Sequence, residues 1–211
     1  MNGLPTYDVP PVPTLQGLLY AAMGRPSLLR PNSLNKDVRD QEESFRARVE
    51  GDCDFAIRVL AEGTTLSSLR KRQKATESGD AESYVGYPAE METLIAPTYR
   101  IYVGGPDDLL SAFQSVLDDP VRMLYLGRSD DLVDIRDVDV TTAELVEEEA
   151  QLDCVIPGGG NEVNLLPIEP DRRAGRTTQP GRVATVSVSG GTVDSYYETE
   201  DEMSERFVYV T

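Results

Sequence analysis

The stretch TYRIYVGGPDDLLSAFQSVLDDPVRMLYL (98–126) carries the clearest succession of elements in the chain. Residues 98–103 have the aromatic and β-branched character of a strand, and a Gly-Gly-Pro turn follows. Apolar residues then recur at helical spacing, at Leu109, Leu110, Phe113, Val116 and Leu117. Residues 123–126 predict a short buried strand. The succession of strand, helix and strand favours a mixed α+β fold.

Upstream of this block, a proline-rich entry leads into a second amphipathic helix. Its apolar positions are Leu15, Leu18, Leu19, Ala22 and Met23, and Thr14 is the predicted N-cap. Alternation of apolar and charged residues over 45–59 predicts a β-hairpin. Residues 61–93 form a polar insertion that is too long for an ordinary connection, so we expect it to be functional or disordered.

Downstream, the chain becomes rich in strand signals. Residues 182–189 and 207–211 predict strands, whereas 141–151 fits either a helix or a strand. The elements would complete a ferredoxin-like β-α-β-β-α-β unit if a strand preceded residue 14, and no such strand is obvious there.

Composition excludes several classes of protein. The net charge of −17 argues against a free-standing, non-specific nucleic-acid binder. The chain has no histidine, which removes mechanisms built on a histidine base or ligand, and we predict neither a metal nor a cofactor. No apolar run approaches the length of a membrane span. Without an export signal, Cys53 and Cys154 are expected to be reduced thiols of a cytoplasmic protein.

The charged residues consist mostly of carboxylates and arginines, and lysine is scarce. Carboxylates are scattered along the whole chain, and only Lys36, Lys71 and Lys74 are lysines among 20 basic residues. This pattern predicts the cytoplasm of an extreme halophile, where salt screens the excess charge. A nucleic-acid mimic and a calcium-loaded protein are the alternatives, although no 12-residue calcium loop is present.

Three stretches, in this order, resemble one family. PPVPTLQGLLYAAMG (10–24), LIAPTYRIYV (94–103) and RMLYLGRSDDL (122–132) are similar to segments of the CRISPR-associated Cas-five subunits, members of the repeat-associated mysterious protein (RAMP) superfamily. The type I-B branch is the most similar. Family members normally begin with a strand before the proline-rich entry, whereas this chain starts almost at the prolines.

The resemblance implies a ferredoxin-like (RNA-recognition-motif-like) RAMP domain over residues 1–140. A β-hairpin thumb insertion would span 61–97, and a small C-terminal β-rich extension would span 141–211. It also implies a subunit that binds the 5′ handle of the CRISPR RNA (crRNA) in a type I Cascade complex. Its partners would be Cas-seven-type backbone subunits and a Cas-eight-type large subunit, with target DNA reached only through the complex.

The candidate RNA-binding residues each have a plainer alternative. Arg70, Lys71, Arg72 and Lys74 form the densest basic cluster, which is either an RNA-gripping thumb or a solvated loop. A second group comprises Thr14, Gln16 and Gly17, which present backbone N–H groups to a phosphate or simply cap the helix. Arg25 contacts RNA or pairs with the helix C-terminus. Arg128 and Ser129 bind RNA, or Arg128 pairs with a neighbouring aspartate.

The sequence leaves three alternative functions open. The first is a non-catalytic crRNA-binding subunit of a Cascade complex in antiviral defence. The second is a metal-free endoribonuclease that processes precursor crRNA, for which only tyrosine and lysine could act as the base. The third is an acidic interaction protein or nucleic-acid mimic.

Overall fold

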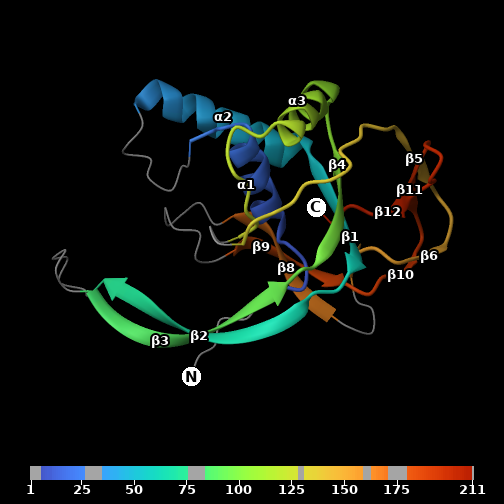
Figure 1. Ribbon diagram of the computed structural model, residues 1–211. Coiled ribbons are helices and arrows are strands. Elements are labelled where there is room, and N and C mark those ends of the chain that lie inside the picture. Colours follow the sequence, from blue (N-terminus) through green and yellow to red (C-terminus); the bar gives the residue numbers. More distant parts are fainter. Residues whose placement is uncertain are drawn as a thin grey trace. The chain divides into compact units, whose positions relative to one another are not determined.

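The computed structural model describes residues 6–26, 35–75, 84–127, 131–158, 163–170 and 180–210. It is a mixed helix and strand fold with small antiparallel sheets (Figure 1). Along the chain the elements are α1 (Val12–Ala22), α2 (Lys36–Asp52), β1 (Asp54–Ala61), β2 (Thr64–Ala75), β3 (Tyr84–Ile95), β4 (Thr98–Gly104), α3 (Asp107–Asp118), β5 (Ala143–Val146), β6 (Ala150–Leu152), β7 (Ile156–Pro157), β8 (Val163–Pro170), β9 (Pro180–Ser187), β10 (Gly191–Val193), β11 (Tyr196–Thr199) and β12 (Arg206–Phe207).

The chain divides into two compact units. The hairpin unit comprises Met1–Asp8 and Leu60–Tyr99, and the main unit comprises Val9–Val59 and Arg100–Thr211. The domain boundary that the sequence predicts at residue 140 stays a prediction.

Helix α1 confirms the amphipathic helix predicted near the N-terminus, but its start was predicted wrongly. The N-cap is Pro11 rather than Thr14. The backbone N–H of Thr14 already donates to the Pro11 carbonyl at 2.9 Å. A proline in the first helical turn costs little, because its missing N–H would have had no partner inside the helix. Pro13 therefore does not delay the helix.

Helix α2 replaces the hairpin predicted over 45–59, of which only the second half is a strand, β1. Asn35 caps α2 by accepting a hydrogen bond from the N–H of Val38 at 2.8 Å. Glu42 and Val49 are buried, and they lie seven residues apart on the face that also carries Phe45. The alternation of Phe45 and Val49 with charged residues therefore fits a helical stripe as well as a strand.

The core of the main unit is built around β1. Phe55, Ala56 and Ile57 are fully buried. The N–H of Val155 donates to Ile57 at 2.8 Å, and that of Val210 donates to Phe55 at 2.9 Å. Two segments from the C-terminal part of the chain are thus hydrogen-bonded to β1, which pairs with β4.

A second cluster lies between α1, α3 and the segment after α3. It contains Leu18, Ala22 and Leu124. The strand predicted at 123–126 is reduced to a single antiparallel bridge between Tyr125 and Leu132. The predicted burial is also wrong for most of this segment, because Leu124 is buried whereas Met123 and Tyr125 are 75% and 43% exposed.

The C-terminal part confirms its predicted strand content. It contains the sheets β12–β11–β5, β7–β9–β8 and β10–β6. Residues 143–146 and 150–152 are strands, which resolves the open choice between helix and strand. The strand predicted at 207–211 is shorter and lies at Arg206–Phe207.

Candidate nucleic-acid interface

The hairpin unit contains the basic cluster. Strands β2 and β3 pair antiparallel over twelve residues each, so much of the polar insertion is an ordered ribbon (Figure 1). Strand β2 includes four basic residues and no acidic one. The register sets its cationic positions Arg70, Lys71, Arg72 and Lys74 opposite Ala89, Pro88, Tyr87 and Val85. The structure thus gathers the predicted RNA-binding residues of the insertion on one strand.

The base of the hairpin is hydrogen-bonded to the N-terminal segment. The backbone N–H of Thr6 donates to the carboxylate of Glu92 at 3.4 Å, and the Tyr99 hydroxyl donates to the Asp8 carbonyl at 2.8 Å. Burial raises the pKa of Tyr99 to about 12, with a further contribution from the charge of Asp8. The phenol stays protonated at neutral pH and remains a hydrogen-bond donor. The N-terminal segment therefore belongs to this unit by specific contacts.

The three predicted residues of α1 differ in how exposed they are. Gln16 is 4% exposed, and the N–H of Thr14 is engaged within the helix start. Gly17 is exposed, and a Cβ at this position would meet no atom within 4 Å. Nothing in the described protein packs closely enough on Gly17 to require glycine. A role of these residues in binding RNA stays a prediction.

Arg25 is held between α1 and α2. Its guanidinium makes an ion pair with Glu42 at 2.8 Å and lies over the Phe45 ring, 3.4 Å from the centroid. Glu42 is only 7% exposed, so this pair is shielded from water. A phosphate would have to compete with a carboxylate for Arg25, and breaking a shielded pair is costly. The proposed contact of Arg25 with RNA also stays a prediction.

Arg128 and Ser129 lie outside the described residues, and so do the side chains of the four basic residues of β2.

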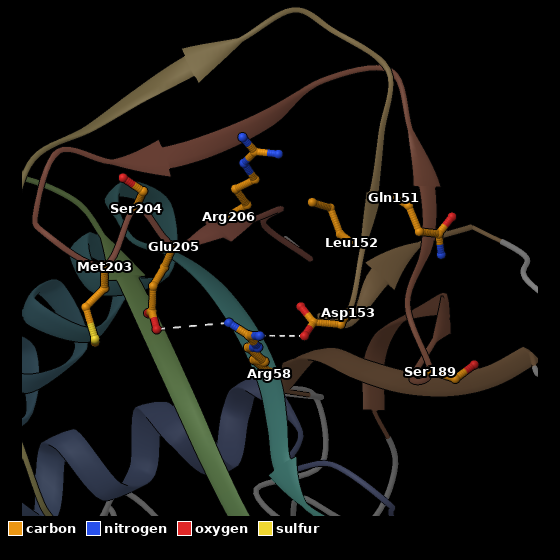
Figure 2. Close-up of a pocket in the computed structure, with 9 residues that line it drawn as sticks. All are labelled: Arg58, Gln151, Leu152, Asp153, Ser189, Met203, Ser204, Glu205 and Arg206. Carbon is orange, nitrogen blue, oxygen red and sulfur yellow. Dashed lines mark hydrogen bonds and ion pairs between the residues drawn. The ribbon is translucent and has the colours of Figure 1, made fainter.

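A cleft that the sequence did not indicate lies in the main unit (Figure 2). Its volume is about 680 Å³. Strand β1 and three distant segments supply its walls, which are Arg58, Gln151, Leu152, Asp153, Ser189, Met203, Ser204, Glu205 and Arg206. No local pattern could have revealed it, because residues almost 150 positions apart in the chain form one surface.

Glu205 is the centre of a charged network beside this cleft. Its carboxylate accepts a hydrogen bond from Tyr102 at 2.7 Å and makes an ion pair with Arg100. Arg58 lies 4.0 Å from Glu205 and bonds Asp153 at 2.5 Å, so it bridges the two carboxylates (Figure 2). The Glu205 side chain is 12% exposed, which strengthens these interactions relative to a pair in open water.

Burial and the neighbouring charges shift the pKa values of Arg58 and Tyr102 in opposite directions. Burial lowers the pKa of Arg58, but hydrogen bonds and charge from Asp153 and Tyr102 outweigh it, so the net shift is upward. Burial also raises the pKa of Tyr102, although Arg58 and Arg100 partly offset this. The network therefore favours the charged form of Arg58 and the neutral form of the Tyr102 phenol. Each of these arginines has a carboxylate partner, which makes the cleft a poor binding site for phosphate.

The two cysteines are buried, free thiols. Burial and the adjacent carboxylates raise the pKa of Cys53 to about 11. Among the described residues, no group of three His, Cys, Asp or Glu side chains is placed to hold a metal ion. In the same part of the chain, no helix is both long and apolar enough to cross a membrane.

Comparison with known proteins identifies matches of two kinds. A family model described as "CRISPR-associated protein (Cas_Cas5)" matches residues 1–202. A chain of a "CRISPR RNA-guided surveillance complex" is similar to this one, with a TM-score of 0.51 and 16% identity over 89% of this chain and 81% of that chain. A crystal structure of a CRISPR protein from Archaeoglobus fulgidus is also similar, with a TM-score of 0.52 and 8% identity over 98% and 89% of the two chains.

No curated protein matches the chain. At these identities the two structural similarities establish a shared fold and carry no information about activity.

Proposed function

The chain belongs to the Cas-five family of CRISPR-associated proteins, and on that premise we propose that it is a non-catalytic subunit of a type I Cascade surveillance complex. In this role it binds and caps the 5′ handle of the crRNA. It anchors the Cas-seven-type backbone and the Cas-eight-type large subunit, and it reaches target DNA only through them. The proposal includes a ferredoxin-like RAMP domain over residues 1–140, a type I-B-like complex and a halophilic cytoplasm.

The basic strand of the hairpin unit carries this proposal. Strand β2 places four cationic positions within five residues of a chain whose net charge is −17. Phosphate oxygens are the usual partners of such residues, and contacts to them position RNA without reading its sequence. A two-stranded ribbon is only marginally stable alone, so a bound partner would also stabilise it. These properties fit a thumb that holds the crRNA backbone.

The pKa values of Tyr99 and Tyr209 make these two residues poor candidates for the base of an RNA-cleaving enzyme. Without histidine, a metal-free ribonuclease would need tyrosine or lysine as its base. Burial raises the pKa values of Tyr99 and Tyr209 to about 12, which leaves almost no phenolate at neutral pH. Incubation of the purified protein with repeat RNA in chelator should leave the RNA intact. Site-specific cuts would replace the present proposal with the endoribonuclease.

The binding proposal is tested by the salt dependence of affinity. Fluorescence anisotropy would follow a labelled RNA that carries the 5′ handle of the host repeat, over a series of salt concentrations. Each phosphate contact to a single strand contributes about 0.7 to the slope of log affinity against log salt. Replacing the four basic residues of β2 by serine should therefore lower the slope by about 3.

A charge-matched variant provides the control. It replaces four ion-paired arginines of the main unit by serine, namely Arg39, Arg48, Arg136 and Arg182. Both variants change the net charge by the same amount. If only the net charge of the protein mattered, the two variants would weaken RNA binding equally. We expect the control to keep the wild-type slope. Equal slopes for the two variants would refute the role of the hairpin.

A further inference from the structure

The register of the hairpin separates the charged positions of β2 and β3 onto two faces. The strands pair in continuous register over twelve residues. Because successive residues of a strand belong to opposite faces, Arg70, Arg72 and Lys74 occupy positions of one face and Lys71 occupies a position of the other. We call the face of positions 70, 72 and 74 the cationic face. The residues of β3 at this face are all uncharged.

The opposite face carries both carboxylates of the two strands. The register places Glu90 and Glu92 on the face of Lys71, and both are exposed. The Ser67 hydroxyl donates to the Glu90 carboxylate at 2.8 Å, which agrees with the register because positions 67 and 90 share this face. One lysine therefore accompanies two carboxylates here, whereas three cations and no carboxylate share the cationic face. A polyanion is attracted to the cationic face.

The spacing of positions on the cationic face fits a nucleic-acid backbone. An antiparallel strand rises about 3.4 Å per residue, so positions 70, 72 and 74 follow one another at intervals of about 6.8 Å. Successive phosphates of an extended single strand of RNA are separated by a similar distance, which lets a row of cations track the backbone. Three cations at this interval match three consecutive phosphates. Lys71 lies on the other face and is not part of this row.

We propose that the cationic face binds three consecutive phosphates of an extended single-stranded RNA segment, one each at Arg70, Arg72 and Lys74. The inference deepens the proposed function and rests on it, because that function supplies the RNA. Contacts to phosphates set the position of the RNA without reading its bases. Lys71 adds to the general attraction for RNA but corresponds to no particular phosphate.

Double-mutant cycles between the full chain and RNA test this correspondence. Single phosphates of the labelled handle RNA are replaced in turn by uncharged methylphosphonate, and fluorescence anisotropy gives each affinity. For the wild type, substitution at three consecutive positions should weaken binding by about tenfold each, as expected for the loss of one charged hydrogen bond. R72S should remove the sensitivity of the middle position alone. R70S and K74S should each remove that of one flanking position.

K71S is the matched control, because it removes one charge at the adjacent position of the opposite face. Its effect should add to that of every methylphosphonate, so all three positions stay sensitive. Binding is measured in salt at which circular dichroism shows a folded chain, and R72Q takes the place of R72S if serine disturbs the spectrum.

The possible outcomes separate the inference from the proposed function. Sensitive phosphates that are not consecutive would overturn the inference, and so would a K71S variant that couples to one phosphate as strongly as R72S does. A folded wild-type chain that does not bind the handle RNA would instead refute the proposed function, and the inference with it.

Discussion

Replacing Glu205 by glutamine removes a charge on which three donors converge, and it should destabilise the main unit measurably. Tyr102 and Arg100 bond this carboxylate, and Arg58 lies 4.0 Å away. A hydrogen bond to a charged group contributes about 1.5–3 kcal/mol to stability. Glutamine keeps an acceptor oxygen for one donor but loses the charge that attracts both arginines. We expect E205Q to lower the free energy of unfolding by about 2 kcal/mol.

The arginines are 27% and 32% exposed, which keeps this value below that of a fully buried pair. Circular dichroism during urea unfolding measures the effect, since the chain has no tryptophan. With a slope of about 2 kcal/mol per molar urea, the midpoint should fall by about 1 M. The variant E169Q is the control, because Glu169 pairs with Arg182 at 3.1 Å in an exposed position. Its cost should stay below about 1 kcal/mol.

A double-mutant cycle with R100M isolates the pair between Arg100 and Glu205. Because the two groups interact directly, the double variant should be more stable than the sum of the single losses predicts. Equal effects of E205Q and E169Q, together with additive losses in the cycle, would refute the idea that Glu205 organises this network.

Three further outcomes follow from the structure. G17A should keep or raise thermal stability, because its Cβ meets nothing and alanine favours a helix by up to about 1 kcal/mol, whereas G104A should lower the melting temperature because its Cβ would collide with Tyr209; the reverse order would contradict the packing described. Stability should fall from pH 9 to 11, because the unfolded chain releases the Cys53 proton near its usual pKa of 9.0 while the folded chain holds it until about 11; C53A should flatten this part of a pH series of urea unfolding curves, and an unchanged slope would count against it. Circular dichroism should show a loosened fold at low salt, where the net charge of −17 repels itself; identical spectra at low and multimolar salt would remove this expectation.

Local periodicity was sufficient for the elements whose buried residues are apolar. Helices α1 and α3 bury apolar side chains at helical spacing, and β4 carries the aromatic and β-branched residues of a strand. All three elements were predicted from the sequence, although α1 starts earlier than predicted. The pattern failed for α2, whose contact face includes charged residues. Arg25 and Glu42 form an ion pair, and Phe45 lies beneath the guanidinium. No hydropathy pattern marks a face whose partner residues are charged.

Of the two parts of the candidate site, the sequence predicted the basic cluster and missed the charged cleft. The basic cluster of β2 is contiguous in the chain, so composition alone singled it out against an acidic background. The charged cleft was missed because Arg58, Asp153 and Glu205 come from three distant segments. Only the hydrogen bonds of β1 to the C-terminal segments bring them together. The predicted roles of Thr14, Gln16 and Arg25 are still predictions.

The sequence by itself determined the charge balance, the absence of histidine chemistry, the amphipathic helices and the family. These properties depend on residue identity and on short-range spacing, which the chain carries into any environment. The tertiary structure alone decided that residues 36–52 form a helix, that Glu205 gathers its donors, and that Met123 and Tyr125 face outward. Each of these outcomes depends on which distant segment packs on the other side, because burial and ion pairing act across space.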